Sequence, residues 1–150
     1  MFLRWIRRSL RASASIPSAA VSFAAVSLAK KIFGDLKGLN VLVIGAGEMG
    51  KLTALHMKSQ GVSQVTIVSR TMAHAARTAE AIGGAAAAPM EELDALLGRA
   101  DIVITATGAA TAVLTRSHIE TVMRPRRNRP LFLIDIAMPR DVEPAAGDIE

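Results

Sequence analysis

The sequence predicts one α/β domain built on a parallel sheet, and three observations support this fold class. The chain has 150 residues, which suits a single domain with its own core. Hydrophobic residues make up 51% of it and aromatic residues only 3%, so Ala, Val, Ile and Leu supply the apolar content. Short aliphatic runs, typical of parallel strands buried on both faces, alternate with stretches of helical periodicity. Such alternation predicts right-handed βαβ units.

A helix over residues 18–33 is the first predicted element. Ser18 is a residue type favoured at an N-cap, and Gly34 provides a C-terminal stop. The apolar run from Ala19 to Ala29 within it is too short and too polar to span a bilayer. The apolar residues that recur at helical spacing in it are Ala20, Phe23, Ala24, Leu28 and Ile32.

Five strands and four further helices follow in alternation. The aliphatic runs predict strands over residues 41–44, 64–68, 85–88, 101–105 and 131–136. The helical stretches are residues 49–60, 71–82 with Thr71 as N-cap, 90–97 and 116–123. We expect the strands in the order 3-2-1-4-5. The chain then divides into an irregular N-terminal extension (1–17), a linking helix (18–34) and the α/β domain (35–150).

The strongest motif is the glycine loop Gly45-Ala46-Gly47-Glu48-Met49-Gly50, which directly follows the first predicted strand and opens a helix. G-x-G-x-x-G in this context indicates dinucleotide binding. Gly45 permits the tight turn, Gly47 lets the backbone approach a pyrophosphate, and Gly50 lets the helix lie close to the strand. The helix N-terminus, including Glu48 and Met49, supplies N–H groups to the anion. The expected fold is therefore a doubly wound sheet of Rossmann type.

The end of the second strand indicates which dinucleotide is bound. An NAD site usually has Asp or Glu there, to accept hydrogen bonds from the ribose hydroxyls. This chain instead has Ser69-Arg70-Thr71. Arg70 can pair with a 2′-phosphate that a carboxylate would repel, while Ser69 and Thr71 can donate hydrogen bonds to it. The sequence therefore predicts NADP(H).

Two more loops should lie at the same edge of the sheet, because ligands of open α/β sheets bind outside the carboxyl ends of the strands. Thr107, Gly108 and Ala109 follow the fourth strand, where small residues can pass close to the ribose and nicotinamide. Ile136 and Ala137 follow the fifth strand, and the preceding Asp135 is expected only to fix a loop.

The composition excludes several kinds of chemistry. Cysteine is absent, so the chain has no disulfide, thiolate metal ligand or cysteine nucleophile. His56, His74 and His118 lack the spacing of metal ligands. We assign no catalytic residue and no metal site.

Two basic clusters could contact RNA or membrane, but no RNA-recognition motif accompanies them, and a solvated helix end and loop is favoured. They are Arg4, Arg7, Arg8, Arg11, Lys30 and Lys31, and Arg124, Arg126, Arg127 and Arg129.

In combination these motifs resemble glutamyl-tRNA reductase, more specifically than they resemble the shikimate and quinate dehydrogenases that share the cofactor-domain plan. The resemblance covers roughly Ser15 to the end. Its residues are 20–26 (AVSFAAV), 31–34 (KIFG), the glycine loop, Ser69-Arg70-Thr71, 100–104 (ADIVI), 106–109 (ATGA), 129–132 (RPLF) and 134–141 (IDIAMPRD). Ser69 stands where the family commonly has Asn.

The resemblance implies a role in tetrapyrrole (porphyrin) biosynthesis in the cytoplasm. Such enzymes use NADPH to reduce glutamyl-tRNA to glutamate-1-semialdehyde. A cysteine in a separate N-terminal domain forms a thioester, and a C-terminal helical domain makes the dimer. The 150 residues are expected to contain neither domain. It is expected to bind NADPH, to catalyse nothing alone, and to reach glutamyl-tRNA only through a cysteine-bearing catalytic domain or subunit.

Other interpretations stay open. A free-standing or degenerate NADP-binding module without catalysis is one, and a fragment of a shikimate-type dehydrogenase is another.

The stretch before Ser18 is rich in Arg and Ser and lacks acids, as in an organellar transit peptide. We favour a non-native start on a truncated gene over a targeting signal.

Overall fold

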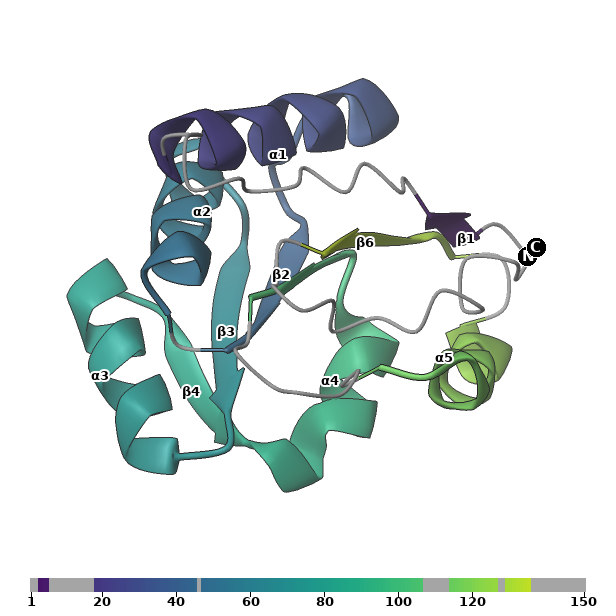
Figure 1. Ribbon diagram of the computed structural model, residues 1–150. Coiled ribbons are helices and arrows are strands. Elements are labelled where there is room, and N and C mark those ends of the chain that lie inside the picture. The colour runs from purple at the N-terminus through teal and green to yellow at the C-terminus, as the bar shows by residue number, and fades with distance from the viewer. Residues whose placement is uncertain (1–2, 6–17, 46, 107–113, 127–128, 136–150) are drawn as a thin grey trace.

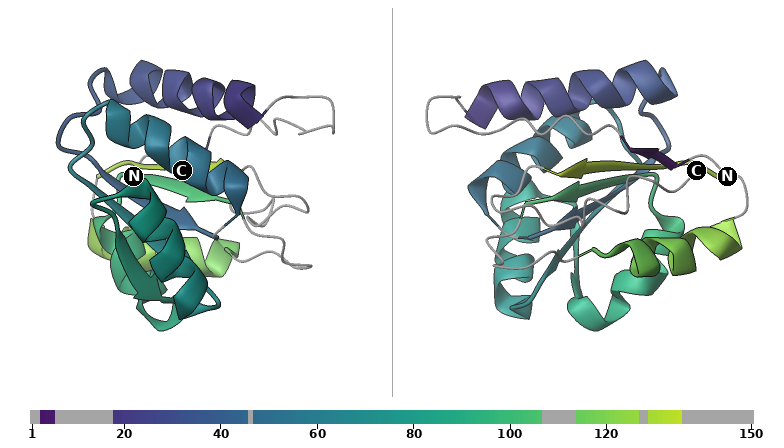
Figure 2. Two further views of the ribbon diagram at one scale, coloured as in Figure 1. Left: turned by 90° about the vertical axis from the view of Figure 1, so that its left-hand side faces the viewer. Right: turned by 45° about the vertical axis from the view of Figure 1, so that its right-hand side comes forward.

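A six-stranded parallel sheet forms the centre of the molecule, with helices on both faces (Figures 1 and 2). The computed structural model describes residues 3–5, 18–45, 47–106, 114–126 and 129–135. Across the sheet the strand order is β1-β6-β5-β2-β3-β4, and every neighbouring pair is parallel. The strands are β1 (Leu3–Trp5), β2 (Asn40–Ile44), β3 (Gln64–Ser69), β4 (Ala86–Pro89), β5 (Ile102–Thr105) and β6 (Leu131–Asp135).

The five predicted strands lie next to one another as β4-β3-β2-β5-β6, which confirms the order 3-2-1-4-5 and the doubly wound fold. The predicted N-terminal helix is confirmed at both ends. The helices are α1 (Ser18–Phe33), α2 (Glu48–Ser59), α3 (Met72–Ile82), α4 (Leu93–Arg99) and α5 (Arg116–Met123), with 3₁₀ turns η1 (Met90–Glu92) and η2 (Arg124–Arg126).

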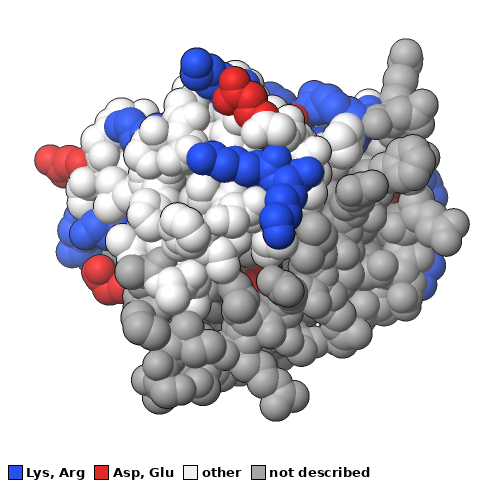
Figure 3. Space-filling model, turned by 90° about the horizontal axis from the view of Figure 1, so that it is seen from above, with Lys and Arg blue, Asp and Glu red and all other residues white. Residues whose placement is uncertain are grey.

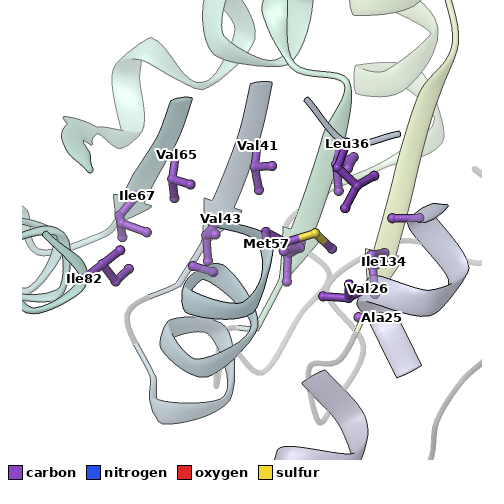
Figure 4. Close-up of a cluster of buried hydrophobic side chains, with 14 of the residues drawn as sticks. Ala25, Val26, Leu36, Val41, Val43, Met57, Val65, Ile67, Ile82 and Ile134 are labelled. Atoms are coloured by element: carbon purple, nitrogen blue, oxygen red, sulfur yellow. The ribbon is translucent and has the colours of Figure 1, made fainter. Parts of the chain in front are cut away.

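Two apolar cores, one on each face of the sheet, explain why the central strands are mostly aliphatic, with no alternation of polar and apolar residues. In β2, Val41 and Val43 point toward α1, α2 and α3, while Leu42 and Ile44 point toward α4 and α5. All four side chains are at most 2% exposed. Figure 4 shows the first core, where Met57 of α2 lies among the side chains of β2, α1 and β6. A strand buried on both faces has no polar alternation in its sequence.

Helix α1 packs on α2 through small residues. Ala25 and Ala29 of α1 are fully buried, which lets the two helices approach closely. The buried Ser22 hydroxyl lies 2.9 Å from Nδ1 of His56 on α2. The helix that the sequence predicts as a linking segment therefore packs into the same core as the sheet.

The N-terminal extension departs from its prediction. Leu3–Trp5 forms β1, which extends the sheet beyond β6, with Arg4 in register with Phe132. The prediction of an irregular stretch was therefore wrong for these three residues, and the rest of it lies outside the described residues. A three-residue edge strand carries too little alternation to be recognised, and its pairing depends on β6, which lies more than a hundred residues away.

Smaller differences occur at element boundaries. The predicted helix 90–97 is divided into the turn η1 and helix α4, which ends at Arg99. The predicted strand 85–88 lies one residue further on, in β4. Thr71 does occupy the N-cap position of α3, but its side chain accepts no capping hydrogen bond. Within the described ranges, no helix is both long and apolar enough to cross a membrane.

Candidate dinucleotide-binding site

The carboxyl ends of four strands meet at one edge of the sheet. Ile44 of β2 is in register with Val68 of β3 and with Thr105 of β5, and Thr105 is in register with Asp135 of β6. From β2 the chain continues outward through β3 and β4 on one side, and through β5 and β6 on the other. The boundary between β2 and β5 is thus the topological switch point, where open α/β sheets bind ligands.

Gly45 makes the turn that leaves β2. Its backbone φ is +113°, in the region that glycine adopts without strain. Its N–H donates to the carbonyl oxygen of Val68 at 2.7 Å, which ties the start of the loop to the end of β3. The role predicted for the first glycine therefore agrees with the geometry, while Ala46 lies outside the described residues.

Gly50 sits where α2 passes over the sheet. A Cβ atom at this position would lie 3.2 Å from Cβ of Ala106 and 3.2 Å from Cγ1 of Val43. Such contacts are tighter than side chains normally make, so a side chain at residue 50 would require α2 or its neighbours to shift. The sequence predicted this packing role for the third glycine.

The N-terminus of α2 points its first turn toward the same edge. Gly47 is its N-cap residue, with extended backbone (φ −80°, ψ 170°), and no side chain caps the helix there. Gly47 and Glu48 are exposed, and Met49 is half-buried. Amide groups of this turn and the positive end of the helix dipole are thus available to an anion such as a pyrophosphate.

The residues after β3 lie beside this turn. The Thr71 N–H lies 3.4 Å from the Ser69 hydroxyl oxygen and donates to it, which bends the chain away from the strand. Arg70 between them is exposed, and within the described part of the chain its guanidinium has no ion-pair partner. An exposed, unpaired guanidinium one strand away from the glycine loop can meet a phosphate bound at this edge.

A further polar pair at this edge was not singled out from the sequence. The fully buried Thr105 hydroxyl donates to Oδ1 of Asp135 at 2.9 Å, joining the last residues of β5 and β6. A threonine at the end of a buried strand gives no signal of such a partner. The predicted loops that follow these strands, residues 107–109 and Ile136 and Ala137, lie outside the described residues.

The second basic cluster requires a correction, because Arg126 is buried and not solvated. Its guanidinium donates to the carbonyl oxygens of Leu97 at 2.8 Å, Ala100 at 2.5 Å and Pro130 at 2.7 Å. Burial lowers the pKa of Arg126 to about 10; Arg129 adds to the shift and Asp101 opposes it. At neutral pH the side chain stays charged and holds the end of α4 against the start of β6.

The described lysines of the first basic cluster lie at a solvated helix end, as the sequence analysis favoured. Lys30 and Lys31 are exposed in the last turn of α1, where positive charge is favourable for the helix dipole. Seen from above, the described part of the face over α1 is largely uncharged, with a few Lys, Arg, Asp and Glu side chains on it (Figure 3). Among the described residues, no group of three or more His, Asp and Glu side chains could hold a metal ion.

Replacing Gly50 with valine tests the packing of α2 on the sheet. The added side chain would collide with Ala106 and Val43, so we expect the free energy of unfolding to fall by about 1–3 kcal/mol. Dinucleotide affinity should fall as well, because the first turn of α2 would be displaced. Chemical denaturation and cofactor titration measure the two effects. Gly98→Val is the control, since nothing lies within 4 Å of a Cβ at Gly98; equal losses in both variants would contradict the explanation.

Comparison with known proteins identifies the family of this chain and several of its relatives. The model of the Shikimate / quinate 5-dehydrogenase family matches residues 27–150. The glutamyl-tRNA reductase of Syntrophus aciditrophicus is 48% identical over 147 residues, covering 97% of this chain and 34% of that protein. The glutamyl-tRNA reductase of Syntrophotalea carbinolica is 48% identical over 130 residues, covering 87% of this chain and 29% of that protein.

A solved structure agrees with the sequence relatives. The glutamyl-tRNA reductase of Methanopyrus kandleri superposes with a TM-score of 0.83 at 39% identity, covering 91% of this chain and 34% of that chain. The chain thus spans about a third of the length of the relatives it matches. The resemblance seen in the motifs is confirmed, and neither alternative interpretation gains support from these relatives.

Proposed function

Because the chain belongs to the Shikimate / quinate 5-dehydrogenase family, and because its relatives are glutamyl-tRNA reductases, we propose that it is the NADP(H)-binding domain of such a reductase. The observation that carries the proposal is the glycine turn at the switch point. There an N-terminus of α2 without a side-chain cap and the exposed Arg70, which has no ion-pair partner among the described residues, lie at one edge of the sheet. This arrangement suits a pyrophosphate and a second phosphate.

The family membership implies a nicotinamide cofactor, and the choice of NADP(H) over NAD(H) is our proposal. No carboxylate stands at the end of β3, where an NAD site would use one for the ribose hydroxyls. Arg70 supplies positive charge there instead, flanked by the hydroxyl groups of Ser69 and Thr71. Since Thr71 N–H already donates to the Ser69 oxygen, the Ser69 O–H is left to donate to a ribose or phosphate oxygen.

In the proposed reaction, glutamyl-tRNA is reduced to glutamate-1-semialdehyde in tetrapyrrole synthesis, and the cofactor supplies the hydride. The chain's own residues bind and orient the cofactor, which is a positioning role. The chain contains no cysteine, so the thioester step falls to a cysteine-bearing catalytic domain or subunit. We place the protein in the cytoplasm, and its contact with glutamyl-tRNA runs through that partner.

Cofactor titration and complementation test the proposal together. Isothermal titration of the chain should show NADPH binding at least about tenfold tighter than NADH, the difference expected for one charge-assisted phosphate contact. Adding a separately produced cysteine-bearing domain of a glutamyl-tRNA reductase should restore semialdehyde formation from glutamyl-tRNA and NADPH. The matched control is the same mixture with a cysteine-to-serine variant of that domain.

The two readouts separate the possible failures. If the chain bound NADPH but did not restore semialdehyde formation, it would be a cofactor-binding module, and its assignment to a reductase would be overturned. Equal affinity for NADPH and NADH would overturn the role of Arg70, and absence of binding to either would overturn the dinucleotide site itself.

A further inference from the structure

A cleft lies at the opposite, amino-terminal edge of the sheet, away from the glycine loop. It encloses about 420 Å³ of space, its open mouth included, between the starts of β2 and β3 and the end of α4. Its lining combines apolar and polar residues. The lining residues that matter here are Asn40, Leu42, Gln64, Thr66, Leu96 and Arg99.

Thr66 is the unusual residue in this lining. It lies in the middle of β3, in register with Leu42 of β2 and Ala86 of β4, and is only 9% exposed. Its hydroxyl makes no hydrogen bond within the described residues, whereas the buried hydroxyls of Ser22, Thr53 and Thr105 all do. A buried polar group without a partner is costly, so a cleft that contains one is suited to a ligand with a hydrogen-bonding group.

The charges around the cleft favour an anion. Arg99 lines it, is exposed, and has no ion-pair partner among the described residues. Arg126 and Arg129 lie behind it, at the carbonyl oxygen of Gly98. The carboxylate of Asp101 is the nearby negative group, and it is already engaged by Arg129 at 3.7 Å and by the backbone N–H of Asn40 at 2.9 Å.

We propose that this cleft binds a small organic anion, such as a short aliphatic carboxylate or phosphate monoester. The anionic group pairs with Arg99, the aliphatic part lies on Leu42 and Leu96, and an oxygen of the ligand meets the Thr66 hydroxyl. The Gln64 side chain, which makes no hydrogen bond within the described part of the chain, supplies a further amide at the rim. The site is separate from the dinucleotide edge and does not depend on the proposed function.

Titration followed by two-dimensional ¹H–¹⁵N NMR tests the site with butyrate, butyl phosphate and inorganic phosphate as probes. We expect saturable shifts of the amide signals of Thr66, Leu96 and Arg99 with butyrate or butyl phosphate, and which of the two binds more tightly identifies the anionic group. Inorganic phosphate should bind at least about tenfold more weakly, because it lacks the aliphatic part. Saturating NADPH should not displace either probe.

Variants distinguish a built site from surface charge. Thr66→Val keeps the shape but removes the hydroxyl; it should weaken binding about three- to tenfold and leave the melting temperature of the free chain unchanged or raised. Arg99→Gln should weaken it about tenfold or more. Arg77→Gln, at an exposed arginine of α3, is the matched control and should change nothing.

Three results would overturn the proposal: no saturable shifts at the cleft, binding of inorganic phosphate as tight as that of the organic probes, or equal effects of Arg99→Gln and Arg77→Gln. If Thr66→Val fails to fold, Thr66→Ser replaces it, because it retains the hydroxyl and should retain affinity. Loss of affinity in a folded Thr66→Ser would show that the hydroxyl is not the contact.

Discussion

Replacing Arg70 with alanine should weaken NADPH binding by about 10- to 100-fold, the loss of one charge-assisted contact to phosphate, and should leave NADH binding nearly unchanged. The physical reason is that only NADPH carries the 2′-phosphate that the guanidinium can meet at the end of β3. Because Arg70 is exposed and has no ion-pair partner within the described residues, its removal costs the free protein little. Isothermal titration with both cofactors measures the ratio of affinities directly.

Two further variants sharpen this test. Arg70→Glu should lower NADPH affinity further and improve the relative binding of NADH, since a carboxylate repels the 2′-phosphate and accepts from ribose hydroxyls. Arg77→Ala, two turns along α3, is the matched control for loss of one exposed positive charge. If Arg70→Ala weakened the binding of NADPH and NADH equally, the side chain would support the loop and would not contact the 2′-phosphate.

Replacing Arg126 with methionine should destabilise the domain by about 3–5 kcal/mol, enough to unfold a marginally stable chain. The guanidinium supplies the donors for the carbonyl oxygens of Leu97, Ala100 and Pro130, and all three would lose their partner at once. Methionine restores part of the apolar volume but no donor. Chemical denaturation measures the change in free energy of unfolding.

Arg124→Met provides the control for Arg126, since Arg124 is an exposed arginine in the same short turn. Its free energy of unfolding should change by no more than about 0.5 kcal/mol, as for most surface substitutions. Arg126→Lys should rescue only part of the loss, because an ammonium group cannot match the planar fork of donors. Equal stability of Arg126→Met and the unaltered chain would show that water replaces the guanidinium without cost.

Much of the fold could be read from local patterns. The runs Val41–Ile44 and Ile102–Ile104 are aliphatic at every position because both faces of each strand are buried, and that signal needs no knowledge of the partners. The spacing of Gly45, Gly47 and Gly50 indicated the turn and the close packing in the same way, since a missing Cβ is a property of the residue itself. The strand order then followed from the rules for βαβ connections.

The sequence by itself thus determined the doubly wound sheet and the helix before it, and it indicated the edge of the sheet where we propose that the dinucleotide binds, with Arg70 beside it. Only the tertiary structure decided what depends on groups distant along the chain. Arg126 looks like any residue of a basic cluster until the carbonyl oxygen of Leu97, 29 positions earlier, is placed against it. Likewise, β1 exists only beside β6, and Thr66 becomes a buried hydroxyl in a cleft only once α4 covers the sheet. Hydrogen bonding and burial depend on which residues are neighbours in space, and local sequence patterns do not show which distant residues become neighbours.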